Sequence, residues 1–168
     1  MRWAYVRPSG IVRIVGDSRK AMSPYFPVRI LVVEDHSHTA ETMTRLLSRW
    51  GYDVATAHSL KGGLDHVDKE SFDVILSDIA LPDGTGYALI SEVRRRGKDV
   101  MAIALSGYEY PAEVKVAKLT GFDHHLSKPC DCAVLRKLLD QRVERQLEAR
   151  AEKRQAKRTD DPSRNGIR

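Results

Sequence analysis

Apolar runs alternate with segments of helical periodicity along residues 28–141. Residues 28–33 form a nearly continuous apolar run rich in β-branched residues, which is typical of a strand buried on both faces. Apolar positions three and four apart then predict a helix over residues 37–50, and Gly51 is placed to end it. The same alternation predicts strands at 53–57, 73–77, 100–105 and 122–126, and helices at 59–67, 86–96, 111–119 and from 131 onward.

Five strands that alternate with five helices predict an α/β fold, in which a parallel sheet carries helices on both faces. Connections between parallel strands are right-handed, and this restricts the possible topologies. The expected arrangement is a flavodoxin-like, doubly wound five-stranded parallel sheet with strand order 2-1-3-4-5.

The flanks of this body have a different pattern. Residues 1–27 contain several prolines and no sustained period, which predicts a poorly ordered arm with one short strand near residues 11–15. Met22 offers an alternative start of translation. Residues 142–168 predict a continuation of the last helix, followed by a frayed tail from Thr159, and their spacing does not make the heptads of a coiled coil.

The net charge of +5 is unevenly distributed. The body carries fourteen Lys/Arg and seventeen acids, whereas residues 1–27 carry five and one, and residues 142–168 carry nine and five. The basic flanks raise the alternative of nucleic-acid binding. Three glutamates dilute the C-terminal basic cluster, however, and residues 142–168 hold no aromatic side chain for base stacking, so nucleic acid is disfavoured as a partner.

The apolar runs are too short for a membrane protein. A bilayer-spanning helix needs about 20 predominantly apolar residues, and no run in the chain approaches that length. Arginines interrupt the apolar stretches of the N-terminus, which argues against a secretory signal. The sequence therefore predicts a cytoplasmic protein without membrane association, either a monomer or a weak dimer.

Polar side chains stand where the predicted strands end. Glu34 and Asp35 follow the first strand, Asp78 the third, Ser106 the fourth and Lys128 the fifth. Ligands of open parallel sheets bind outside the carboxyl ends of the strands, so these five side chains are expected along one edge. Crowded carboxylates repel one another and favour a hard divalent cation such as Mg²⁺, which prefers oxygen ligands.

This set resembles the receiver domain of bacterial two-component response regulators, over about residues 28–141. The resemblance rests on the acidic pair after the first strand, the D-x-x-L-P-x-x-x-G pattern from Asp78 to Gly86, the serine that ends the fourth strand, and Lys128-Pro129 after the fifth. It implies that Asp78 accepts a phosphoryl group from a histidine kinase or a histidine phosphotransfer protein. The altered surface would then bind an unknown downstream protein.

The resemblance also implies the ligands of a magnesium ion, which are Glu34, Asp35, Asp78 and the backbone carbonyl of Ala80. Ser106 and Lys128 would contact phosphoryl oxygens. Three further residues, Pro82, Gly86 and Pro129, would have structural roles, and the Lys128–Pro129 bond is expected to be cis.

Two positions depart from the family pattern. His125 stands where the family usually has Tyr or Phe, and it would act with Ser106 as a switch residue, since an imidazole side chain can still rotate. Ala80 replaces a longer side chain beside the path of attacking water, so the lifetime of the phosphoryl group is expected to differ in a direction that stays open. Self-phosphorylation from small donors and autodephosphorylation, both slow, are the only reactions expected.

Other functions fit less well. An Asp-nucleophile phosphatase of the haloacid-dehalogenase type needs a second Asp two residues after the first, where this chain has Ala80. Residues 34–38 lack the glycine-rich turn of a nucleotide-binding Rossmann protein. The pair Cys130 and Cys132 lacks the second pair of a zinc site and is too close for an easy disulfide, so it is interpreted as two small residues at a helix start. The arginines of 94–96 are interpreted as a solvated helix end.

Overall fold

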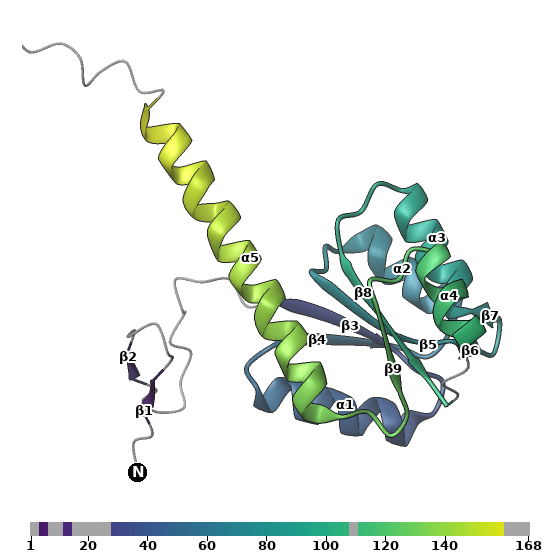
Figure 1. Ribbon diagram of the computed structural model, residues 1–168. Helices are drawn as coiled ribbons and strands as arrows, with labels where there is room; N and C mark the ends of the chain where they lie inside the picture. The colour runs from purple at the N-terminus through teal and green to yellow at the C-terminus, as the bar shows by residue number, and fades with distance from the viewer. Residues whose placement is uncertain (1–3, 7–11, 15–27, 108–110, 160–168) are drawn as a thin grey trace, which may run out of the picture.

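A computed structural model describes residues 4–6, 12–14, 28–107 and 111–159. Its centre is a five-stranded parallel sheet (Figure 1) made of β3 (Arg29–Val33), β4 (Asp53–Ala57), β5 (Val74–Asp78), β8 (Met101–Ser106) and β9 (His124–Ser127). The strands lie in the order β4-β3-β5-β8-β9, which is 2-1-3-4-5 along the chain, so the predicted topology is confirmed.

Helices cover both faces of the sheet (Figure 1). On one face lie α1 (Ser37–Arg49) and α5 (Cys132–Thr159); on the other lie α2 (Leu60–Lys69), α3 (Gly86–Arg95) and α4 (Pro111–Leu119). Successive strand residues point to opposite faces. Ile75 accordingly packs with the α2–α3–α4 side and Leu76 with the α1–α5 side, and both are fully buried, which explains why the strand sequences are continuously apolar.

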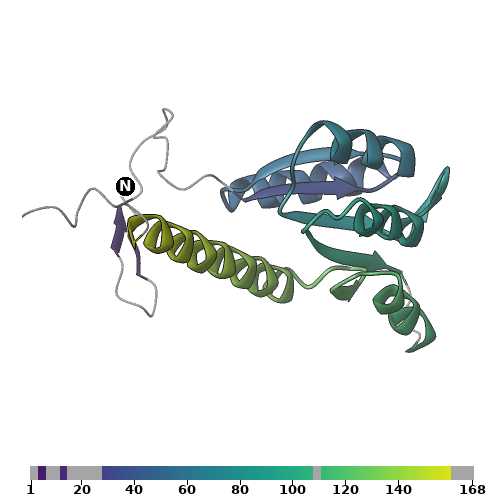
Figure 2. The ribbon, with the colours of Figure 1, turned by 90° about the horizontal axis from the view of Figure 1, so that it is seen from above.

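The long helix α5 continues past the sheet, as Figure 2 shows. The first turn of this continuation still contacts the body of the protein, because Val143 packs against the apolar core on the α1–α5 face of the sheet. The Arg142 guanidinium donates to the carbonyl oxygen of Asp99 at 3.2 Å, and the Gln146 amide contacts the Asp73 carboxylate. None of the described helices combines the length and apolar composition that crossing a bilayer requires.

The ends of the chain differ from expectation in two respects. The arm contains two short strands in place of one, β1 (Ala4–Val6) and β2 (Val12–Ile14), paired antiparallel. Helix α5 runs through Thr159, where the frayed tail was expected to start. The rest of the arm, with Met22, and the tail from residue 160 lie outside the described residues.

Arg94 is a clamp between α3 and the neighbouring loops. Its guanidinium donates twice to the carbonyl oxygen of Gly121, at 3.0 and 2.9 Å, and once to that of Val100, at 2.8 Å. It also forms an ion pair of 2.8 Å with Asp123. Gly121 has a φ of +103°, and a Cβ there would lie 2.8 Å from Arg94 Cγ, so glycine suits this close approach.

The interpretation of residues 94–96 as a solvated helix end is therefore wrong for two of the three arginines. Arg94 bonds across loops, and Arg96 bridges Glu92 and Asp68 with a side chain only 25% exposed. Arg95 is the solvated one, with a side chain 73% exposed. Sequence periodicity places all three near a helix end, but it does not reveal which of them has carbonyl oxygens within reach.

Replacing Arg94 by Lys removes the planar fork that serves several acceptors at once. We expect Arg94→Lys to lower the free energy of unfolding by about 2 kcal/mol, because buried carbonyl oxygens lose their donors. Arg95→Lys is the matched control and is expected to leave the unfolding midpoint unchanged. Urea unfolding followed by circular dichroism measures both, and equal midpoints for the two variants would contradict the clamp.

Candidate functional site

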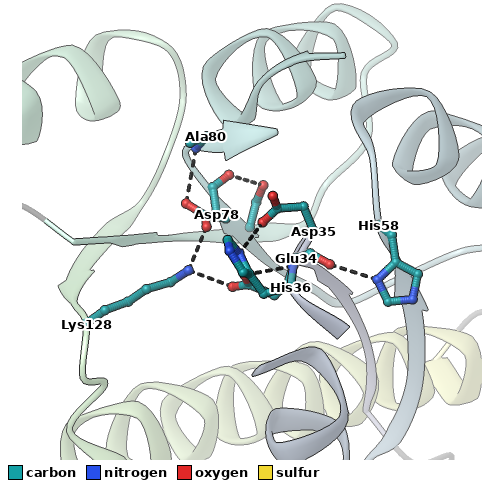
Figure 3. Close-up of polar contacts among 8 residues, drawn as sticks. Glu34, Asp35, His36, His58, Asp78, Ala80 and Lys128 are labelled. Atoms are coloured by element: carbon teal, nitrogen blue, oxygen red, sulfur yellow. Dashed lines mark hydrogen bonds and ion pairs between the residues drawn. The ribbon is translucent and has the colours of Figure 1, made fainter. Parts of the chain in front are cut away.

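An ammonium group bridges two buried carboxylates at the carboxyl edge of the sheet (Figure 3). Glu34, directly after β3, is 1% exposed, and Asp78, at the end of β5, is 9% exposed. Lys128, directly after β9, places its Nζ 2.6 Å from Glu34 Oε2 and 2.6 Å from Asp78 Oδ2. The structure thus brings three of the predicted site residues into direct contact.

The bridge is held together by charge. Burial by itself lowers the pKa of Lys128, but the hydrogen bonds to Asp78 and Glu34, together with their negative charges, outweigh burial and hold that pKa above its ordinary value. Lys128 is therefore protonated at neutral pH. The ammonium contacts the carboxylates of Glu34 and Asp78, while the neighbouring Asp35 carboxylate contacts His36. Three carboxylates thus lie close together at this edge, and a divalent cation would reduce the repulsion among them.

The loop after Asp78 holds the carboxylate by its own backbone. The Ala80 N–H donates to Asp78 Oδ1 at 3.1 Å, and the buried Ser77 hydroxyl donates to the carbonyl oxygen of Asp78 at 2.8 Å. Gly86 closes the loop by donating its N–H to the carbonyl oxygen of Ile79 at 2.8 Å. A Cβ at Gly86 would lie 2.2 Å from the carbonyl oxygen of Asp78, so any side chain there displaces the loop.

Within this loop a small hairpin forms that the sequence patterns did not predict. Its strands are β6 (Ala80–Leu81) and β7 (Gly84–Thr85), and Pro82 and Asp83 make the turn between them. The Asp83 carboxylate accepts the N–H groups of Leu60, at 2.7 Å, and Lys61, at 2.9 Å, at the start of α2. Those hydrogen bonds, that of Lys61 foremost, hold the pKa of Asp83 below its usual value and tie the hairpin to α2.

Beside the bridge lies a second group of ligand atoms. His36 Nδ1 donates to Asp35 Oδ1 at 2.7 Å and lies 3.4 Å from Glu34 Oε1. The hydrogen bond to Asp35 foremost raises the pKa of His36. Within the described part of the chain, Glu34, Asp35 and His36 are the residues whose potential metal-ligating atoms lie within 4.8 Å of one another.

This compact group contains Glu34 and Asp35 of the predicted metal ligands and adds His36. The role of Asp78 as a ligand stays a prediction. The Asp78 oxygens face the Ala80 N–H and Lys128 Nζ, and Asp78 is not part of the compact group. The available sequence signal for His36 was its position directly after the acidic pair. The oxygen donors of Glu34 and Asp35 still fit a hard cation such as Mg²⁺.

The remaining predicted residues lie on neighbouring strands. Ser106 is buried at the end of β8, and its carbonyl oxygen accepts the Lys128 N–H at 2.7 Å. His125 lies opposite Ala104 in β9, so it faces the α4 side of the sheet, and its Nε2 is buried without a hydrogen-bond partner among the described residues. The Lys128–Pro129 bond is cis, as the resemblance implied.

The two cysteines lie at the start of α5, outside the acidic pocket. Asp131 between them caps the helix, because its Oδ1 accepts the N–H groups of Ala133 and Val134 at 2.7 and 3.2 Å. Both thiols are free. Cys132 is exposed, whereas burial foremost raises the pKa of the Cys130 thiol to about 11.

Comparison with known proteins gives one consistent family. Residues 30–140 match the model of the response regulator receiver domain. The chain is 33% identical over 114 residues to an uncharacterized 14.6 kDa protein of Leptolyngbya boryana, covering 67% of this chain and 87% of that protein. It is 30% identical over 131 residues to the sensor histidine kinase RcsC of Escherichia coli, covering 78% of this chain but only 14% of the kinase.

Solved structures agree with these sequence matches. A CheY-like response regulator receiver domain protein from Methanospirillum hungatei superposes with a TM-score of 0.67 at 27% identity. The superposition covers 73% of this chain and 99% of that one.

Gly86→Ala tests the close approach between α3 and the backbone of Asp78. We expect it to lower the free energy of unfolding by about 2 kcal/mol, because the added methyl group forces the loop away from β5. Gly107→Ala is the control, since nothing lies within 4 Å of a Cβ at that position. Urea unfolding of both variants provides the comparison, and a Gly86 variant as stable as the control would refute the steric constraint.

The different burial of Cys130 and Cys132 predicts that their thiols are alkylated at different rates. With a pKa of about 11, about one Cys130 thiol in a thousand is ionised at pH 8, and the thiolate is the reactive form. Iodoacetamide is therefore expected to modify Cys132 first at pH 8, and modification of Cys130 is expected to accelerate about tenfold per pH unit up to pH 10. Peptide mass mapping against time measures both rates; equal rates at pH 8 would contradict the burial of Cys130.

Proposed function

The chain belongs to the response regulator receiver family of two-component signalling, and on that premise we propose that Asp78 is its phosphoryl acceptor. The observation that carries the proposal is the Lys128 ammonium between Asp78 and Glu34 at the carboxyl edge of the sheet. A nucleophilic carboxylate needs a cation beside it to receive a phosphoryl group, because the attacking group and the phosphoryl oxygens are all negative.

The transfer is an exchange of one bond to phosphorus for another. A carboxylate oxygen of Asp78 attacks phosphorus, the bond from phosphorus to the phosphohistidine nitrogen of the donor breaks, and the electron pair stays on that nitrogen. The donor is a histidine kinase or a histidine phosphotransfer protein. The Ala80 N–H and the buried Ser77 hydroxyl keep the carboxylate and its backbone in one orientation, which favours attack along one line.

The residues around Asp78 stabilise the negative charge that arrives. Lys128 exchanges part of its contact with the carboxylates for a phosphoryl oxygen, and the Ser106 hydroxyl hydrogen-bonds another. Glu34, Asp35, Asp78 and the carbonyl oxygen of Ala80 would hold a Mg²⁺ ion, which would supply positive charge to offset that of the transferred group.

The output is a change of surface. A phosphoryl group adds about −1.5 to −2 units of charge, which draws Ser106 and the start of its loop inward and shifts His125 in β9. The adjoining face of α4, β9 and α5 then binds a downstream protein. We propose that the protein acts in this way in the cytoplasm, as a monomer or weak dimer, and that its own chemistry is confined to slow Mg²⁺-dependent self-phosphorylation and autodephosphorylation.

Phosphoramidate, a small phosphoryl donor, tests the acceptor directly. With Mg²⁺ present, intact mass spectrometry is expected to find one phosphoryl group on the wild type and none on Asp78→Asn, because the amide is a poor nucleophile. Asp83→Asn is the control: it removes a carboxylate from the same loop, and its label is expected to match the wild type. Label on Asp78→Asn at the wild-type level would reject Asp78 as the acceptor.

A further inference from the structure

We propose that His36 is an additional metal ligand of the acidic pocket and makes the pocket prefer Mn²⁺ to Mg²⁺. The inference rests on the proposed function, since it concerns the cation that assists phosphorylation of Asp78. It goes beyond that function because it assigns to a residue of this chain a contact that the predicted ligand set, all of it oxygen, does not contain.

The position of the His36 imidazole points to this contact. Its Nδ1 lies 2.7 Å from Asp35 Oδ1 and 3.4 Å from Glu34 Oε1, so it faces the same two carboxylates that a cation would use (Figure 3). The side chain is 75% exposed, so it has room to adjust to a cation. A cation on these carboxylates lies within reach of Nδ1, whose proton leaves to water.

The polar contacts of the His36 side chain are with the carboxylates of Asp35 and Glu34. The residue stands at the N-cap of α1, where side chains commonly bond to the first backbone N–H groups, yet it makes no such hydrogen bond. The backbone before it is held firmly: the Glu34 N–H donates to the carbonyl oxygen of Ala57 at 3.0 Å, and His58 Nδ1 donates to that of Glu34 at 2.9 Å. The imidazole is therefore placed beside the pocket by a fixed strand end.

Glu34 has one oxygen left for a cation. Its Oε2 accepts from the Lys128 ammonium, while Oε1 accepts the His36 backbone N–H at 3.4 Å and faces the His36 ring, with a further lone pair for a cation. Two carboxylate oxygens and one imidazole nitrogen thus converge on one point. That arrangement supplies both a negative charge and a softer donor on the side of the pocket away from Lys128.

The choice of metal follows from the donor atoms. Mg²⁺ demands oxygen ligands and near-ideal octahedral geometry, and it gains little from an imidazole. Imidazole nitrogen suits first-row transition metals, while carboxylates suit Mn²⁺ as well as Mg²⁺. Mn²⁺ would therefore gain the His36 nitrogen in addition to the carboxylate oxygens of Glu34 and Asp35, whereas Mg²⁺ would be held by the oxygen ligands of the pocket alone.

Metal titration of the full chain tests the inference, with Mn²⁺ followed by electron paramagnetic resonance and Mg²⁺ by calorimetry. We expect His36→Gln to weaken Mn²⁺ binding about 10-fold and to change Mg²⁺ binding by less than about twofold, because only Mn²⁺ loses a ligand. His38→Gln is the matched control, since His38 is an exposed histidine two residues further along. It is expected to behave as the wild type with both cations.

A spectroscopic readout separates coordination from a merely structural effect. Electron spin-echo envelope modulation of bound Mn²⁺ is expected to contain the ¹⁴N signal of a coordinated imidazole in the wild type and in His38→Gln, and to lose it in His36→Gln. The inference is overturned if the wild type lacks the nitrogen signal or if His36→Gln weakens both cations equally. Loss of Mg²⁺ binding in Asp35→Asn would show that the cation binds at the acidic pocket. With that control in place, either of the two overturning outcomes rejects the role of His36 and leaves the metal site of the proposed function standing. If neither cation binds the wild type, the metal site of the proposed function fails with it.

Discussion

The ion bridge from Lys128 to Glu34 and Asp78 is the interaction on which the rest of the site depends. Two carboxylates that are almost fully buried would repel each other and pay a large desolvation penalty without a cation between them. The three residues follow three different strands, which only the parallel order of the sheet brings to one edge. The fold thus concentrates negative charge at one point and holds it there with a single ammonium.

Contacts around the site hold the loops that carry these charged residues in place. Gly86 permits the helix α3 to approach the backbone of Asp78, and Asp83 ties the following hairpin to the first N–H groups of α2. At the opposite edge, Arg94 joins α3 to the loops that precede β8 and β9. These contacts join the loops on both edges of the sheet to the helices α2 and α3.

Sequence patterns located secondary structure best in strands that helices cover on both faces of the sheet. Nearly continuous apolar runs identified the three central strands β3, β5 and β8, because a strand covered on both faces has few polar positions to interrupt it. The edge strands β4 and β9 are only partly buried and carry polar residues, so their signal was weaker. The patterns were least informative where a short loop folds on itself. The β6–β7 hairpin has strands of two residues each, too short for any periodicity, and the contacts of Arg94 depend on carbonyl oxygens from distant loops.

The sequence by itself determined the fold class, the strand order and the residues that stand at the strand ends, because those follow from hydrophobic period, crossover handedness and the position of polar residues after apolar runs. Only the tertiary structure decided how these residues are paired. Lys128 lies between Glu34 and Asp78, because distances between side chains from separate segments are set by packing and not by spacing along the chain. The structure also places the His36 imidazole against the carboxylates of Asp35 and Glu34.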